Sequence, residues 1–155
     1  ELKPSNYQPI PVKTNSAGEK YSKILNKIFI NDYDFKDYDR ATNIYWPGNK
    51  LGHGREDVIK FWNSLKSILS EIKFKIEHVG YLDEPNRNPR ASIRWSLEGI
   101  HSKDSKDYGK KTNSNLSFIG INHAELNPYG VIKEWVLFDE VAIWKQILMN
   151  KNKNG

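Results

Sequence analysis

The pattern of apolar positions changes its period within the last third of the chain, residues 112–149. Apolar residues are dense over 115–126, the tetrad NPYG supplies turn chemistry, and residues 131–138 are rich in β-branched and aromatic side chains. This stretch predicts a long β-hairpin. From Asp139 to Met149 the apolar residues recur at helical spacing behind an acidic residue suited to an N-cap, which predicts a closing helix packed on the sheet.

The earlier part of the chain alternates between helical and strand-like periods. Residues 1–16 carry three prolines and little periodic pattern, which is typical of an extended arm or linker. Helical spacing begins directly after Ser16, a residue type that caps helices. In order, the pattern predicts a helix over 17–31, a short helix over 34–39, a short strand over 42–46, a long core helix from Arg55, and strands over 73–82 and 90–101.

Alternation along each predicted strand separates an inner side from an outer side. Trp95 shares its side of the strand with other apolar residues, and His123 shares its side with Ile119 and Ile121. The inner positions that we expect to carry function are His78, Trp95, His101, His123, Trp135, Leu137 and Asp139. The charged residues expected on the outer side, where opposite charges pair across strands or a dimer interface, are Arg94, Glu98 and Glu134.

The order of the elements predicts an α+β architecture. Successive strands joined by short turns favour an antiparallel sheet with helices on one face. A length of 155 residues fits a single hydrophobic core and is too short for two ordinary ones. We therefore expect an extended arm or linker over 1–16, one domain over 17–149 and a flexible tail over 150–155.

The charge and cysteine content exclude several functions. The net charge is +5, but the basic residues are scattered apart from four lysines over 103–111 and a Lys/Asn tail. Because no basic stripe is interleaved with exposed aromatic residues, we expect no nucleic-acid partner. The chain has no cysteine, which excludes disulfides and thiolate chemistry.

The length of the apolar runs and the identity of the first residue give expectations about the cellular location of the protein. The longest apolar run is far shorter than the ~20 residues of a spanning helix, so we expect a soluble protein with no membrane partner. Because the chain begins at Glu1 rather than Met, we expect that an upstream piece was removed by processing or cloning, and a lost signal peptide or additional domain stays open. A cytoplasmic location is the first expectation, and a secreted or periplasmic one stays open.

Four pieces of the sequence together resemble a known family. They are LGHGREDVIKFW, SIRWSLEGIHS, GINHAEL before the NPYG turn, and VIKEWVLFDEVAIWKQI. In this order and spacing, over roughly residues 20–148, they resemble the SnoaL-like polyketide cyclases and ester cyclases of the nuclear-transport-factor-2-like superfamily. The resemblance implies a cone, the cystatin-like α+β roll, in which a curved sheet wraps around N-terminal helices and encloses an apolar pocket. It also implies a homodimer built sheet against sheet.

The resemblance further implies a reaction and its residues. Polyketide cyclases of this group close a ring by an intramolecular aldol reaction that uses polar side chains in the cone, without a metal or cofactor. Their inward histidine on the penultimate strand matches His123, and their acid/base aspartate on the last strand falls at Leu137, after an inward Trp135. Leucine cannot move a proton, so this chain departs from the family at that position.

The candidate site combines one imidazole with nearby acidic and aromatic side chains. Imidazole titrates near neutral pH, so His123 could act as a general base, with Asp139 orienting it. Asp139 also suits the N-cap of the closing helix. The residues expected to bind ligand are Trp95, Trp135, Leu137, Tyr45, Trp46, His53, His78 and His101. A metal site built from the three inner histidines is not favoured, since they are scattered over three strands.

These features predict a protein that binds a small hydrophobic or aromatic molecule in the cone pocket. Cofactor-free acid/base chemistry on that molecule, of the cyclase, isomerase, hydratase or hydrolase type, would use His123 and Asp139. The alternative is a non-catalytic module in which the same cone carries a ligand or forms a dimer. A fold by itself does not choose between them.

Overall fold

A computed structural model describes residues 11–30 and 32–153 of the chain. Most of the predicted arm, residues 1–10, lies outside the described residues. The helices and strands are, in chain order, α1 (Ala17–Ile28), β1 (Tyr38–Trp46), β2 (Lys50–His53), α2 (Gly54–Lys66), β3 (Leu69–Leu82), β4 (Arg90–His101), β5 (Asn115–Asn127), β6 (Gly130–Phe138) and α3 (Glu140–Lys153).

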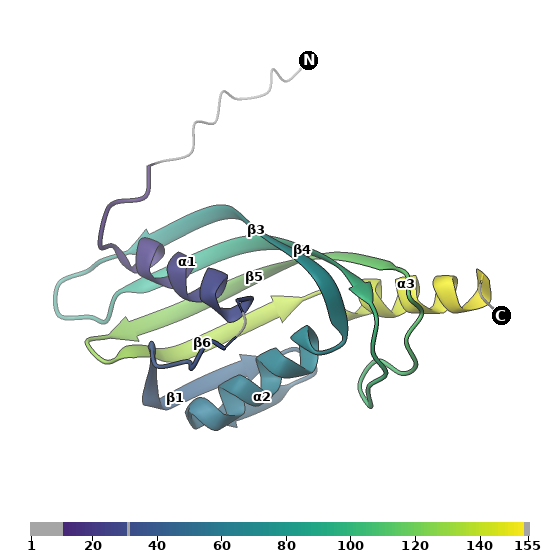
Figure 1. The fold of residues 1–155 in the computed structure, drawn as a ribbon. Helices are drawn as coiled ribbons and strands as arrows, with labels where there is room; N and C mark the ends of the chain where they lie inside the picture. Colours follow the sequence, from purple (N-terminus) through teal and green to yellow (C-terminus); the bar gives the residue numbers. More distant parts are fainter. Residues whose placement is uncertain (1–10, 31, 154–155) are drawn as a thin grey trace, which may run out of the picture.

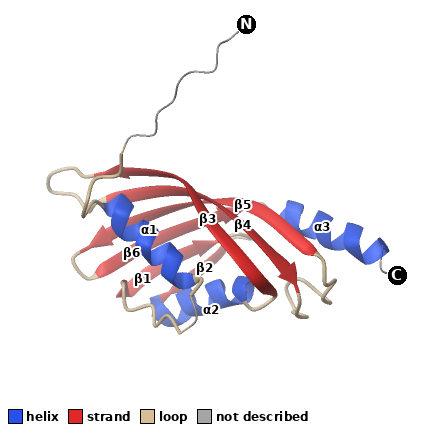
Figure 2. Ribbon diagram, turned by 45° about the horizontal axis from the view of Figure 1, so that its top comes forward, coloured by secondary structure: helices blue, strands red, loops and turns tan. Residues whose placement is uncertain are grey.

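The six strands form one curved sheet in the order β2-β1-β6-β5-β4-β3. All neighbours in the sheet are antiparallel except β1 and β6, which are parallel. The sheet is therefore mixed, whereas short turns between strands predicted a wholly antiparallel one. The parallel pair joins strands far apart in the sequence, so no hairpin constrains its direction. Figures 1 and 2 show α1 and α2 on one face of the curved sheet, with α3 beyond one end of it.

The predicted elements are confirmed over most of the chain. Ser16 caps α1, because its Oγ accepts a hydrogen bond from the Glu19 N–H at 3.2 Å. The short helix predicted over 34–39 is wrong: Phe35 takes a left-handed backbone conformation with φ 56°, and β1 begins at Tyr38. Strand β2 was not predicted, because two glycines in LGHG look like turn residues. Helix α3 continues four residues past Met149, to Lys153.

The concave side of the sheet is filled by aromatic side chains. Trp62 of α2 and Trp95 of β4 are fully buried. The Trp46 ring meets Trp62 edge to face, with centroids 5.1 Å apart, and Phe29 stacks on Phe74 at 4.3 Å. These rings occupy the space between the helices and the sheet, so the interior of the cone is a packed core.

Helix α3 covers the part of β5 that β6 leaves unpaired. β6 pairs with β5 from Gly120 onward, so the first residues of β5 have no strand neighbour on that side. The Gln146 side chain takes the place of a strand there: its Oε1 accepts from the Ser117 N–H at 2.9 Å and its Nε2 donates to the Ser117 carbonyl at 2.8 Å. Among the described residues, no helix has the length and apolar character needed to cross a membrane.

Candidate functional site

The inner and outer sides of the β5–β6 hairpin are the reverse of the predicted ones. The side chains of β5 and β6 that face the core are Leu116, Phe118, Asn122, Ala124, Leu126, Val131, Glu134, Val136 and Phe138. His123, Trp135, Leu137 and Asp139 face outward and are exposed, so their predicted inward placement is wrong. The outer side is itself apolar, with Ile119 58% and Leu137 65% exposed. Because both sides of β5 and β6 carry apolar residues, the alternation does not show which side faces the core.

Glu134 of β6 is the centre of a buried polar cluster. Its Oε2 accepts hydrogen bonds from the Tyr21 hydroxyl of α1 and, at 2.7 Å, from the Tyr38 hydroxyl of β1. Its Oε1 accepts from the Trp62 indole N–H of α2 at 3.0 Å. All four side chains are fully buried. The carboxyl group therefore ties both helices and β1 to the middle of the sheet.

Asn122 of β5 extends this cluster across the sheet. Its Oδ1 accepts from the Trp95 indole N–H at 2.9 Å, and its Nδ2 donates to the Tyr21 hydroxyl oxygen at 3.0 Å. The inward placement of Trp95 is confirmed, and its indole N–H has the partner that a buried tryptophan needs. We call Tyr21, Tyr38, Trp62, Trp95, Asn122 and Glu134 the carboxyl cluster.

Burial shifts the pKa values in the carboxyl cluster. Removal from water raises the pKa of Glu134, although hydrogen bonds from Tyr21, Tyr38 and Trp62 act in the opposite direction. Burial and then the negative charge of Glu134 raise the pKa values of Tyr21 and Tyr38 well above the ordinary value. Both phenols therefore keep their protons and donate. The cluster can hold a proton within an apolar core, but both carboxyl oxygens are already hydrogen-bonded.

The sequence analysis placed Glu134 on the outer side and gave it a structural ion-pairing role. The placement is wrong, because Glu134 is fully buried. One signal pointed to it: Asn122 and Glu134 share the inward side with Phe118 and Phe138, whereas Trp135 is the one Phe, Tyr or Trp residue on the outward side of β5 and β6. If the inward side had been assigned from the aromatic residues rather than from His123, Asn122 and Glu134 would have been predicted to face the core.

Several predicted ligand-binding residues do come together, but on the outer face of the sheet. A groove of about 970 Å³ is lined there by Tyr45, Leu51, Ile121, His123, Trp135 and Leu137, among others. The Tyr45 and Trp135 rings stack with centroids 5.5 Å apart and an interplanar angle of 5°. Trp46 also contributes to this groove, although most of its surface is buried. We call this the outer groove. Ligand binding by these residues stays a prediction.

The remaining histidines do not converge. His101 is buried at the end of β4, as predicted, where its Nδ1 lies 3.3 Å from the Thr112 Oγ1 and burial lowers its pKa. His78 is exposed on the outer face, because a bulge between Ile76 and His78 reverses the alternation of β3. His53 is also exposed, with its Nδ1 2.7 Å from the Asn43 Oδ1. The described residues contain no group of His, Cys, Asp or Glu able to hold a metal ion.

Asp139 caps α3. Its Oδ1 accepts from the Ala142 N–H at 2.9 Å, which confirms the capping interpretation. In the described part of the chain no hydrogen bond joins Asp139 to His123, and the catalytic roles of these two residues stay a prediction.

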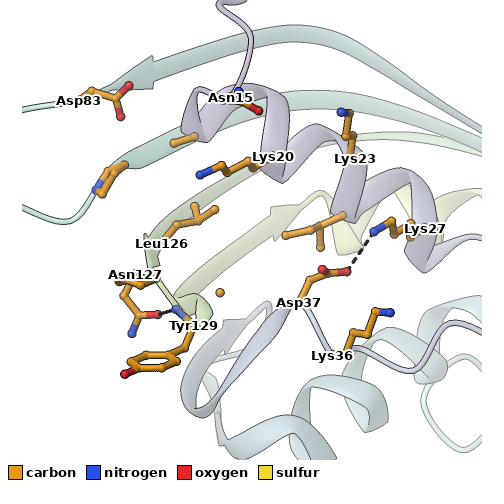
Figure 3. A pocket seen from close by; sticks show the side chains of 15 residues that line it. Asn15, Lys20, Lys23, Lys27, Lys36, Asp37, Asp83, Leu126, Asn127 and Tyr129 are labelled. Carbon is orange, nitrogen blue, oxygen red and sulfur yellow. Dashed lines mark hydrogen bonds and ion pairs between the residues drawn. The ribbon is translucent and has the colours of Figure 1, made fainter.

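A second cavity lies at the end of the cone, between α1 and the turn that joins β5 to β6 (Figure 3). It has a volume of about 670 Å³. Its apolar lining comes from Ala17, Ile24, Pro89, Leu126, Pro128 and Tyr129. Its charged lining comes from Lys20, Lys23, Lys27, Lys36, Asp37 and Asp83. We call this the end pocket. The end pocket was not predicted from the sequence, because its residues belong to separate elements that only the fold brings together.

The helices on one face of a curved, six-stranded sheet confirm the predicted α+β fold, and solved structures of proposed SnoaL-like polyketide cyclases share it. A proposed SnoaL-like polyketide cyclase from Jannaschia sp. CCS1 superposes with a TM-score of 0.68 at 13% identity, over 88% of this chain and 97% of that one. A proposed polyketide cyclase from Pseudomonas putida KT2440 gives 0.69 at 8% identity, over 84% and 97%. IdmH from Streptomyces antibioticus, another proposed polyketide cyclase, gives 0.66 at 12% identity, over 83% and 96%.

These similarities are similarities of fold, since the sequences share few residues. A comparison with protein-family models finds no match, and a comparison with curated proteins finds none either.

Proposed function

We propose that this chain is a SnoaL-like protein that binds a small molecule with an apolar or aromatic body in the end pocket. The observation that carries the proposal is the cavity itself. Its volume of about 670 Å³ is within the range of small-molecule sites, and its wall combines buried apolar side chains with a charged rim. Ala17, Ile24 and Leu126 are each under 10% exposed and form a fixed apolar surface.

The geometry favours ligand binding in the end pocket over catalysis by the carboxyl cluster. The carboxyl cluster occupies the middle of the concave side, and Glu134 has no exposed surface. A general acid or base must come within hydrogen-bond reach of its substrate. None of the six side chains of the carboxyl cluster lines the end pocket, so the pocket wall brings no group of that cluster to a bound molecule.

A neutral aromatic probe, 2-naphthamide, tests the binding proposal. We expect a titration followed by ¹⁵N–¹H NMR to shift the backbone amides of Lys20, Ile24 and Tyr129, which line the end pocket. The indole N–H signal of Trp135, which lines the outer groove, should stay in place. Binding that moves the Trp135 signal and leaves the α1 amides unchanged would contradict the proposal. A failure of both 2-naphthamide and its carboxylate analogue 2-naphthoate to bind at millimolar concentration would contradict it as well.

A homodimer formed through the outer face is a second candidate function. The specific observation is an exposed apolar surface made by Tyr45, Leu51, Ile119, Ile121, Trp135 and Leu137, each 38–65% exposed. These residues lie on β1, β2, β5 and β6, on the face opposite the two helices. A large exposed apolar patch on a sheet is typical of an interface, and covering it with a second copy would remove it from water.

Light scattering tests the dimer. We expect the wild-type chain to have the mass of two copies at about 50 μM, well within the concentration range of weak dimers. Leu137→Lys should shift the mass toward one copy, because it places a charge in the centre of the patch. Ile30→Lys is the matched control, since Ile30 is 61% exposed and follows α1, away from the patch. A monomeric wild type would rule the dimer out.

A further inference from the structure

We infer that the end pocket selects an organic anion: a small molecule with an apolar or aromatic body that carries a carboxylate. This inference rests on the proposed function, since it names the class of ligand for the same pocket. It is carried by the balance and arrangement of the charges around the pocket.

Lysines outnumber carboxylates in the wall of the end pocket. Four lysines line it, against Asp37 and Asp83. Three of the four, Lys20, Lys23 and Lys27, are spaced three and four residues apart and so follow one side of α1. Figure 3 shows these three along α1, above the turn that carries Tyr129. The positive charges therefore form a row along one edge of the cavity.

Two of the lysines already have carboxylate partners. Lys27 Nζ lies 3.2 Å from Asp37 Oδ2, and Lys23 Nζ lies 3.1 Å from Glu19 Oε1. Among the described residues, Lys20 and Lys36 form no ion pair. In Figure 3 the Lys20 side chain leaves α1 on the side where Leu126 is drawn, and both residues line the end pocket. Lys20 is therefore the cation best placed to meet the charged group of a ligand.

Asp37 does not cancel the remaining positive charge. Burial alone would raise its pKa, but hydrogen bonds from Tyr33 and Lys27 outweigh burial and hold the pKa below the ordinary value. The Tyr33 hydroxyl donates to Asp37 Oδ2 at 2.7 Å, the same oxygen that Lys27 contacts. Asp37 is thus a charged group with its partners already in place.

The apolar surface lies beside the lysines and completes an amphiphilic site. Ile24 and Leu126 are buried at its base, and the Tyr129 ring is 79% exposed at its rim. A flat apolar body can cover Ile24 and Leu126 while its carboxylate reaches Lys20. A neutral molecule of the same shape keeps the first interaction and loses the second.

A matched pair of probes tests this inference. 2-Naphthoate and 2-naphthamide have the same ring system and differ in charge, and their dissociation constants are measured by NMR titration at pH 7. We expect the wild type to bind 2-naphthoate about fivefold more tightly than 2-naphthamide, as one partly exposed ion pair allows. Lys20→Gln should remove most of this preference, because it should weaken the binding of 2-naphthoate more than that of 2-naphthamide. The preference should also decrease when the ionic strength is raised.

Lys60→Gln is the matched control. Lys60 is exposed on α2, does not line the end pocket, and its replacement changes the net charge by the same amount. An equal loss in Lys60→Gln and Lys20→Gln would assign the preference to net charge and overturn the inference. Equal affinities for the two probes in the wild type would also overturn it, while leaving the proposed function intact. If neither probe binds, the proposed function fails as well.

Discussion

At the scale of single residues, Glu134 links several elements of the fold through hydrogen bonds. Its carboxyl group receives hydrogen bonds from α1, β1 and α2, and all of the partners are buried. A buried polar group without a partner costs free energy, so the two phenols and the indole depend on this one acceptor.

Replacing Glu134 by alanine should therefore destabilise the fold strongly. Glu134→Ala leaves three buried donors without an acceptor, and we expect the free energy of unfolding to fall by about 3 kcal/mol or more. Urea denaturation measures the change. Glu98→Ala on the exposed side of β4 is the control and should stay within about 0.5 kcal/mol of the wild type. Similar small losses for both variants would show that the carboxyl cluster does not hold the elements together.

The raised pKa of Glu134 makes a prediction about pH. Its pKa is raised in the folded state by burial, so the contribution of this group to stability is fully present below the unfolded value of 4.5. That contribution is lost as the pH rises through the folded pKa. Glu134→Gln cannot titrate, so the stability advantage of the wild type over this variant should shrink between pH 4.5 and neutrality. An advantage that grows with pH would mean that the three donors lower the pKa instead.

Individual residues also show which side-chain orientations could be predicted from the sequence and which could not. Trp95 was placed inward correctly, because on β4 only one side is apolar. His123 and Glu134 were placed on the wrong sides, because β5 and β6 carry apolar residues on both sides. The apolar residues on the outer side line the outer groove, which the alternation alone does not indicate.

At the scale of elements, Gly120 of β5 lies close against the Trp95 side chain of β4. A β-carbon added at Gly120 would overlap the Trp95 indole, whereas one added at Gly80 would meet nothing closer than 3.9 Å. We expect Gly120→Ala to lower the free energy of unfolding by about 2 kcal/mol, since overpacking a core forces its neighbours to move. Gly80→Ala should be nearly neutral. Equal stability of the two variants would show that the cone has free space beside Trp95.

Helix α3 packs through the buried Ile143 and Ile147, and Gln146 adds its hydrogen bonds to the unpaired part of β5. Gln146→Ala removes both hydrogen bonds to Ser117, and we expect faster hydrogen exchange at the Ser117 amide, with global stability reduced by only about 1 kcal/mol. Lys145→Ala, at an exposed position next to it, is the control. Unchanged exchange at Ser117 in Gln146→Ala would contradict the role assigned to this glutamine.

Most elements were predictable because their periods are clear, and the failures have physical causes. The bounds of β4 match the prediction because strict alternation fills the whole strand. The short helix over 34–39 failed because a left-handed Phe35 ends any helical run there. The parallel pairing of β1 with β6 joins strands that are far apart in the sequence, so a local pattern of residues does not predict it.

At the scale of the whole molecule, the resemblance predicted the fold correctly, and ligand binding in a pocket of that fold stays a prediction. The curved sheet and its two covering helices are confirmed. Their concave side is filled by tryptophan, tyrosine and phenylalanine side chains around the carboxyl cluster. The end pocket and the outer groove lie at the margin and on the back of this core.

Hydrogen exchange of the indole N–H groups tests this account most directly. Trp62 donates to Glu134 and Trp95 donates to Asn122, both from fully buried positions. If the cone is filled, these two indole protons should exchange as slowly as the most protected backbone amides, in the free protein and with 2-naphthoate bound. Exchange of either indole within minutes would show that water reaches Glu134 through a hollow interior. That result would return the ligand site to the middle of the cone.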